Sequence, residues 1–225
     1  MTAKTIDIIK RYAVATVGLL LIAVGVALSI ESDLGTSPVS CPPYVVNLWN
    51  STLTVGQYTI LMHLLFILIQ VALLRKDFKA RYLMQIVASV VFGLLTDLCI
   101  WAFSWIEVST YAGRLGLTLL AVVITALGIS IEVLPQAWML AGEQTVWAIS
   151  KVSKVKFSTI KIAFDVALVA IAAIFAFCAF HNPTGTADSV VIREGTLIFA
   201  VFTGLCMKLT DPLAAKLFPS MANGR

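Results

Sequence analysis

Charged residues are scarce in this sequence: Asp, Glu, Lys and Arg make up 12% of the 225 residues, whereas 60% are apolar. Soluble domains carry about 25% charged and about 45–50% apolar residues. So few charges cannot cover the surface of a water-soluble protein of this size. The composition therefore excludes a cytosolic enzyme, a nucleic-acid-binding protein and a disordered chain, and it indicates a protein that crosses a membrane several times.

The motifs of common enzymes and metal sites are also missing. The four cysteines lie far apart, with no Cys-x-x-Cys pair, so neither a zinc site nor a disulfide framework is expected. No nucleotide-binding loop, HExxH or GxSxG motif occurs. We therefore expect no cofactor, no metal and no catalytic residue, and a membrane-embedded enzyme ranks third among the functional hypotheses.

Six segments are apolar enough, and at about 20 residues long enough, to cross the hydrocarbon core of a membrane as helices. These segments are 11–31, 55–74, 82–105, 114–134, 158–179 and 192–212. Lys and Arg accumulate on the cytoplasmic side of membrane proteins. With both termini in the cytoplasm, 14 of the 16 basic residues lie inside, and only Arg114 and Arg193 lie outside. The net charge of +4 therefore indicates orientation in a lipid bilayer and not a nucleic-acid partner.

The two halves of the chain are similar in sequence. Leu-Ser-Ile-Glu ends the first span at Glu31, and Ile-Ser-Ile-Glu ends the fourth span at Glu132. Phe-Gly-Leu-Leu-Thr-Asp at 92–97 likewise resembles Thr-Gly-Leu-Cys-Met-Lys at 203–208. Because each half holds three spans, an odd number, the second half must run in the opposite sense across the membrane. Inverted repeats of this kind are a recurrent design of secondary transporters.

We therefore expect an all-α integral membrane protein whose six transmembrane helices form two inverted three-helix repeats. The whole chain, 1–225, is expected to form a single membrane domain. Repeat one covers about 11–107 and repeat two about 114–212.

Each repeat also contains a semi-apolar segment that is too short to span the membrane. The first is 32–49, in which Ser37 and Pro38 are predicted to be the N-cap and first residue of a short helix. The second is 135–149. Segments of this length are typically re-entrant or interfacial, and both alternatives stay open.

Residues 33–38 (Asp-Leu-Gly-Thr-Ser-Pro), followed by 56–60 (Gly-Gln-Tyr-Thr-Ile), resemble the YczE/YyaS/YitT-type bacterial membrane proteins. The later stretch 157–165 is similar to the second-half motif of that family. Where the family commonly has Trp-Asp after the proline, this chain has Val39 and Ser40. The resemblance implies a six-span protein of a bacterial inner membrane that transports, and it implies no substrate.

Ionisable side chains inside a membrane cost about 2.5–3.5 kcal/mol each on insertion scales, so they are functional candidates by default. His63 and Asp165 each lie about eight residues into their spans, near the midplane at a rise of about 1.5 Å per residue. The repeat aligns the two residues with each other. A histidine and a carboxylate close together in low dielectric would form a proton-binding pair. The alternative is a static hydrogen bond or ion pair that joins two helices.

Other polar residues near the short segments are further candidates. Asp97 is expected to face a cavity. Glu31 and Glu132 end their spans beside the short segments and are either gates or ordinary interfacial carboxylates. Glu143 is expected in the first turn of the second short helix, where the positive end of the helix dipole stabilises a carboxylate or binds an anionic substrate group. Cys41 is expected to be exposed enough to touch a substrate.

The leading hypothesis is a secondary transporter or channel for a small polar solute, with its site at the repeat interface near the bilayer midplane and with proton coupling. The candidate substrate-binding residues are His63, Asp97, Asp165, Glu143, Gln144 and Cys41. The candidate gate or proton-coupling residues are Glu31, Glu132, Asp165 and His63. Three carboxylates against at most one lysine favour a cationic or zwitterionic solute. The alternative is a non-transporting accessory protein that binds a partner subunit or a lipid head group.

Two further features concern packing and placement in the bilayer. The small residues Gly18, Gly25 and Ala27 permit close helix packing or a homodimer. Aromatic residues near the ends of the spans are interpreted as interfacial anchors. These residues are Tyr44, Trp49, Trp101, Trp105, Trp138 and Trp147.

Overall fold

The computed structural model describes residues 3–135, 137–186 and 189–222, and within these ranges it contains helices and no β-strand. Six helices are long and apolar enough to cross a membrane, so the chain is a multi-pass membrane protein and the six predicted spans are confirmed. These helices are α1 (Ala3–Glu31), α3 (Val55–Leu74), α4 (Met84–Phe103), α5 (Tyr111–Val133), α7 (Phe157–Phe180) and α8 (Glu194–Leu217).

Shorter helices connect the long ones. They are α2 (Cys41–Trp49), α6 (Ala141–Ser153), α9 (Pro219–Ala222) and two 3₁₀ turns, η1 (Arg75–Asp77) and η2 (Ala80–Leu83). The helix α2 begins three residues later than predicted, because the amides of Ser40 and Cys41 both bond to the carbonyl of Ser37 and form a turn there. Pro42 and Pro43 then occupy the first turn of α2, where a missing N–H costs nothing.

Local chemistry explains where several of the long helices begin and end. At the start of α3, the Thr54 hydroxyl accepts from the Gln57 amide (3.2 Å) and the Gln57 side chain accepts from the Thr54 amide (3.0 Å), which makes a capping box. The Thr110 hydroxyl accepts from the Gly113 amide at the start of α5. At the other end of the chain, α8 continues past the predicted end at Pro212 and stops at Leu217.

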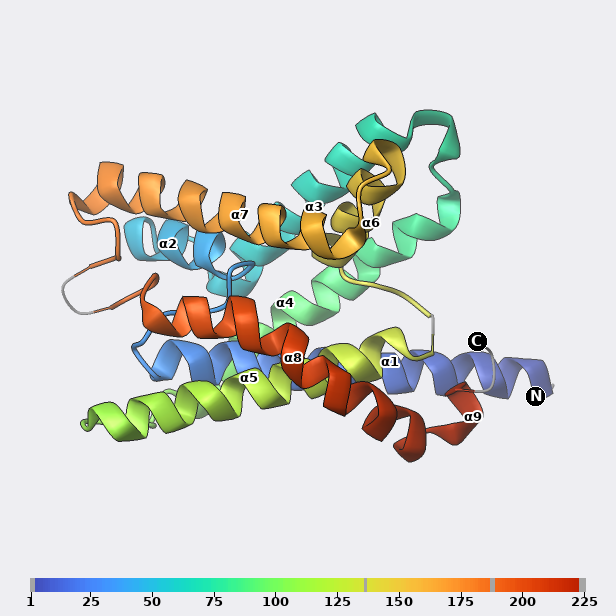
Figure 1. Cartoon of the computed structure of the whole chain (residues 1–225), viewed down its shortest axis with the longest axis horizontal. Coiled ribbons are helices and arrows are strands. Elements are labelled where there is room, and N and C mark those ends of the chain that lie inside the picture. The colour runs from blue at the N-terminus through green and yellow to red at the C-terminus, as the bar shows by residue number, and fades with distance from the viewer. Residues whose placement is uncertain (1–2, 136, 187–188, 223–225) are drawn as a thin grey trace.

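The helices α1 and α5 form the centre of one side of the bundle and run in opposite directions (Figure 1). Their backbones touch: a Cβ at Gly18 would lie 2.5 Å from the Glu132 amide nitrogen, and one at Gly128 would lie 2.8 Å from the Ile22 nitrogen. A Cβ at Gly25 would overlap the Thr125 side chain. The small residues of α1 are therefore used for packing inside the chain.

Of the remaining long helices, α4 and α8 flank this pair, and α3 and α7 form a second side. The helix α4 packs on α1, and α8 packs on α5. On the second side, α3 packs on α4, α2 and α6, while α7 packs on α2 and α6. We call the end of the bundle where α1 begins and α8 ends the terminal face, and the opposite end the distal face; both chain ends lie toward the terminal face in Figure 1.

The two short helices lie toward opposite faces, α2 near the distal end of α7 and α6 near the terminal end of the bundle (Figure 1). Their starting segments come together in the interior. Val39, just before α2, lies 3.8 Å from the position of a Cβ on Gly142. Val39 also packs against the cluster that holds Phe66, Ala141 and Leu168. The beginnings of α2 and α6 therefore meet between α3 and α7.

Candidate functional site

A pocket of about 680 Å³ lies at the distal face. It is bounded by the ends of α1 and α4, by α2, and by the starts of α3 and α5. Its polar lining consists of Glu31, Asp33, Tyr44, Asn47, Glu107, Ser109, Arg114 and Ser189. We call it the distal pocket. Of these residues, sequence reasoning singled out Glu31 as a functional candidate and interpreted Tyr44 as an interfacial anchor.

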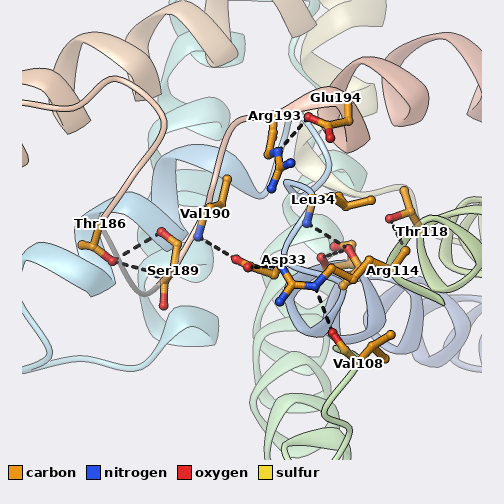
Figure 2. Close-up of polar contacts among 12 residues, drawn as sticks. Asp33, Leu34, Val108, Arg114, Thr118, Thr186, Ser189, Val190, Arg193 and Glu194 are labelled. Atoms are coloured by element: carbon orange, nitrogen blue, oxygen red, sulfur yellow. Dashed lines mark hydrogen bonds and ion pairs between the residues drawn. The ribbon is translucent and has the colours of Figure 1, made fainter. Parts of the chain in front are cut away.

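Asp33 and Arg114 organise the wall of the distal pocket. Figure 2 shows the Arg114 guanidinium between two partners: Nη1 donates to Asp33 Oδ2 (2.6 Å) and Nε donates to the Val108 carbonyl (2.9 Å). The other oxygen of Asp33 accepts from the amide of Val190 (3.0 Å). Asp33 has φ 52°, in the left-handed region that Asp tolerates better than most residues. This junction ties the end of α1 to the start of α5 and to the segment before α8.

Negative charge prevails in the distal pocket. Three carboxylates line it, Glu31, Asp33 and Glu107, against the single guanidinium of Arg114. Because Arg114 is bonded to Asp33, the carboxylates of Glu31 and Glu107 remain to attract a cation. Tyr44 adds a neutral phenol to the lining, and burial raises its pKa further above the ordinary value.

A second pocket, of about 440 Å³, lies at the terminal face. Four aromatic rings line it, in two edge-to-face pairs: Tyr12 with Trp138 (centroids 5.0 Å apart) and Tyr82 with Trp147 (5.8 Å). The other lining residues are Met84, Gln85, Val133, Ala137, Met139 and Gln144. We call it the terminal pocket. Trp138 and Trp147, expected to be interfacial anchors, therefore help to form a cavity, and the predicted substrate residue Gln144 lies here.

A neutral polar network lies between the long helices on the second side. The side-chain amides of Gln70 and Gln85 bond reciprocally, at 3.0 and 2.8 Å. The same Gln70 nitrogen donates to Thr145 Oγ1 (2.9 Å) and to the Ala141 carbonyl (3.1 Å) of α6. Both glutamines are buried. Sequence reasoning missed this network, although two glutamines inside apolar spans were a readable signal.

Ionisable groups cluster where α6 meets α7. Lys161 Nζ lies 2.9 Å from Asp165 Oδ1 and 3.9 Å from Glu143 Oε1. Glu143 occupies the first turn of α6, as predicted. We call Lys161, Asp165 and Glu143 the lysine cluster. Sequence reasoning chose both carboxylates but counted Lys161 only as a basic residue near the cytoplasm.

Glu132, in the last turn of α5, is completely buried beside the start of α6. Its Oε1 accepts the amide of Leu140, the residue before the helix, at 2.9 Å. Its Oε2 has no hydrogen-bond partner in the part of the chain that the structure describes. Glu31, its counterpart by sequence, instead lines the distal pocket at the end of α1. The two residues thus sit in unlike surroundings.

The predicted pair of His63 and Asp165 does not form. His63 Nδ1 bonds to the hydroxyl of Ser89 on α4 (3.0 Å), and its ring stacks on Phe92 at 5.9 Å. Asp165 bonds to Lys161 on its own helix. The faces of α3 and α7 that carry His63 and Asp165 turn toward α4 and toward α6 respectively. His63 therefore forms a hydrogen bond that joins α3 to α4, in line with the alternative interpretation of a static contact between two helices.

Asp97 does not face a cavity but stabilises the start of α3. Its Oδ1 accepts the amide of Gly56 (2.7 Å), and its Oδ2 accepts the hydroxyl of Thr54. A carboxylate at this position satisfies free amides and interacts favourably with the helix dipole. The close approach of α3 to α4 at Gly56 and Gly93 brings the two groups together.

Cys41 is also placed differently from the prediction. It is fully buried against Val45 of α2 and Ala172 of α7, and its sulfur lies 3.7 Å from the carbonyls of Thr36 and Val191. Burial raises the pKa of the Cys41 thiol to about 12. Cys41 therefore contacts no solute in this conformation and remains protonated.

Comparison with known proteins gives a family and no activity. One family model, described as "Family of unknown function (DUF6198)", matches residues 9–212. No curated protein and no solved structure matches the chain. Nothing in these comparisons assigns a role to either pocket or to the lysine cluster.

Proposed function

The chain belongs to this family of unknown function, DUF6198, and from its geometry we propose that it is a secondary transporter for a small polar solute. The observation that carries the proposal is a pair of pockets at opposite faces of one helical bundle, one lined by charged residues and the other by aromatic rings and two amides. The tips of α2 and α6 meet in the interior, and the buried glutamine network borders the terminal pocket at Gln85. A solute would pass from one pocket to the other when this barrier rearranges.

An inverted repeat would explain how the barrier rearranges. The order long, short, long, long occurs twice, as α1–α4 and α5–α8. Packing partners also correspond: α1 on α4 matches α5 on α8, α2 on α3 matches α6 on α7, and α3 on α6 matches α7 on α2. Inverted repeats allow one half to rock against the other around a central site. We propose that α2 and α6 are the re-entrant segments of these two repeats.

The distribution of basic residues supports an orientation. Most Lys and Arg residues lie at the terminal face or in the loops that join helices there, such as Arg75–Asp77. Because positive residues accumulate in the cytoplasm, we propose that the terminal pocket faces the cytoplasm and the distal pocket faces the outside of a bacterial inner membrane. The resemblance of 33–38 to the YczE/YyaS/YitT-type proteins agrees with this location.

The lysine cluster is our proposed coupling site. Lys161 is paired with two carboxylates, Asp165 and Glu143. A third carboxylate, Glu132, accepts the amide just before α6, and its other oxygen has no partner among the described residues. Each of these charges is costly inside a membrane. A proton that binds to one carboxylate would weaken its hold on Lys161 and so shift α7 relative to α6. This charge change gives the transporter a route to proton coupling.

The transport proposal is tested with purified protein in proteoliposomes that contain a pH-sensitive dye. We expect a cationic or zwitterionic solute to drive proton movement, and Asp165→Asn to reduce that movement strongly, because it removes the carboxylate that is bonded to Lys161. The matched control is His63→Gln, whose predicted pairing with Asp165 is absent. Equal proton movement in wild type and Asp165→Asn would refute the coupling role.

One observation favours the alternative, an accessory protein. Lys208 is exposed on α8, nine residues before the helix ends at Leu217, among the exposed apolar residues Leu205 and Leu209. A lysine on an uncovered apolar face suits contact with a partner subunit or a lipid head group. The accessory function would replace transport if no cationic, zwitterionic or neutral solute moved and if Lys208→Leu released a copurifying subunit.

A further inference from the structure

The terminal pocket has the chemistry of a site for an organic cation. Its walls combine the rings of Tyr12, Tyr82, Trp138 and Trp147 with two amide side chains, and no Lys, Arg, Asp or Glu is among the lining residues that the structure describes. Aromatic faces attract ammonium groups, most strongly where water is excluded, and clusters of such rings bind quaternary ammonium compounds. An inorganic cation would instead require oxygen ligands in a tight arrangement.

The protein's own lysine illustrates this chemistry at the edge of the pocket. Lys151 Nζ lies 5.5 Å from the ring centre of Trp147. Lys151 is also bonded to Asp77 (2.8 Å), and Arg11, beside Tyr12, is bonded to Asp7 (2.8 Å). Lys151 and Arg11 are therefore each paired with a carboxylate. Their charges do not repel a cationic ligand as strongly as free charges would.

Two buried polar atoms near the pocket, one donor and one acceptor, have no hydrogen-bond partner among the described residues. The indole Nε1 of Trp138 is a buried donor without an acceptor among the described residues, and Glu132 Oε2 is a buried acceptor without a donor there. Glu132 accepts the amide of Leu140. Val133, which follows Glu132, and Met139, which precedes Leu140, both line the pocket. A buried polar atom left unpaired costs free energy. A ligand with an acceptor oxygen would reduce the cost at the Trp138 N–H.

We propose that the terminal pocket binds a small alkylammonium compound that also carries a hydroxyl or carboxylate oxygen. The aromatic rings surround the ammonium group, and the Trp138 N–H donates to the oxygen. This proposal rests on the proposed function, because it names the class of solute that the transporter would release or take up at the terminal face.

Binding is measured by equilibrium dialysis of the purified protein in detergent, with labelled choline as the probe. The neutral isostere 3,3-dimethylbutan-1-ol has the same shape without the charge. We expect the isostere to compete at least about tenfold more weakly than unlabelled choline, since the cation–π contribution of a desolvated site corresponds to roughly that factor. Equal competition by the two compounds would overturn the proposal.

Variants locate the ligand in the pocket. We expect Trp147→Leu to weaken choline binding by about tenfold, whereas Trp105→Leu, a control that removes a ring 76% exposed outside the pocket, leaves it unchanged. Trp138→Phe keeps a ring and removes the N–H, so it should weaken choline binding more than tetramethylammonium binding. Equal binding by wild type and Trp147→Leu would overturn the proposal even if Trp138→Phe failed to fold.

Choline binding and solute movement, measured on the same protein, distinguish failure of the pocket assignment from failure of the transport proposal. Choline binding with the expected variant pattern, but without movement of any solute in proteoliposomes, would refute transport and support the pocket. Movement of another solute, together with absent choline binding, would support transport and overturn the pocket assignment.

Discussion

The segments 92–97 and 203–208 are similar in sequence, yet their glycines have different neighbours. A Cβ at Gly93 would lie 2.6 Å from the Ile60 side chain and 2.7 Å from the Gly56 carbonyl oxygen. A Cβ at Gly204 would meet nothing within 4 Å. One half therefore has a tightly packed α3–α4 pair, whereas the main packing partners of α7 are α2 and α6 and that of α8 is α5. Similar sequences are thus compatible with tight packing of α4 on α3 at Gly93 and with open space beside Gly204 on α8.

The last residues of these two segments, Asp97 and Lys208, also differ in their surroundings. Asp97 is bonded to the start of α3, while Lys208 is exposed on α8. The α3–α4 pair is thus held by backbone contact and by a capping carboxylate at one site. We expect this pair to move as one body in any rearrangement, and α7 and α8 to move separately.

The largest expected difference concerns cysteine reactivity. Cys41 is buried, whereas Cys178, near the end of α7, is exposed. Burial raises the pKa of the Cys41 thiol from 9.0 to about 12, which lowers its reactive thiolate fraction by about a thousandfold. In single-cysteine variants we expect a maleimide to label Cys178 within minutes and Cys41 only after denaturation. Rapid labelling of Cys41 at pH 7 would show that α2 leaves α7 in the native protein.

The next largest effect concerns the helix contact itself. We expect Gly93→Val to destabilise the protein by about 1–3 kcal/mol, because overpacking forces neighbouring backbone apart. The matched variant is Gly204→Val, whose new side chain enters open space. Thermal unfolding in detergent, followed by loss of monodisperse protein, measures both. Equal shifts in Tm would mean that the two halves are packed alike.

A smaller effect is expected from the capping carboxylate. Asp97→Asn removes the negative charge beside the amide of Gly56 and places an amide group where one acceptor was, at a cost of about 0.5–2 kcal/mol. Lys208→Gln is the exposed counterpart and should leave the free energy of unfolding unchanged. If Asp97→Asn abolished transport with an unaltered Tm, Asp97 would belong to the solute path instead.

The smallest effect concerns the junction at the distal face. The Asp33–Arg114 pair is about one third exposed on both sides, so we expect Asp33→Asn to cost no more than about 1 kcal/mol. Asn tolerates the left-handed backbone at this position and keeps an acceptor for the Val190 amide. Chemical denaturation of this variant beside Arg193→Gln, which breaks a similarly exposed pair, provides the comparison. A larger loss would mean that the junction holds the two halves together.

The sequence predicted the six spans, the two short helices and Glu143 in the first turn of α6, because these features depend on local hydropathy and helix-start chemistry. It could not predict which way each span turns. Thr59, His63 and Gln70 mark a buried side of α3, but nothing in the pattern indicates that His63 faces α4 and not α7. Asp97 and Cys41 were misplaced for the same reason, since their partners Gly56 and Val191 lie far away in the chain.

The reciprocal amide bonds of Gln70 and Gln85 have an electrical consequence. A charge that moves through the membrane potential exchanges about 2.3 kcal/mol per 100 mV, so an ion pair at this junction would strengthen or weaken with voltage. Two neutral amides exchange almost none of that work. The junction of α3, α4 and α6 is therefore expected to have the same strength in an energised cell as in a depolarised one, so the voltage acts instead on charged groups such as those of the lysine cluster.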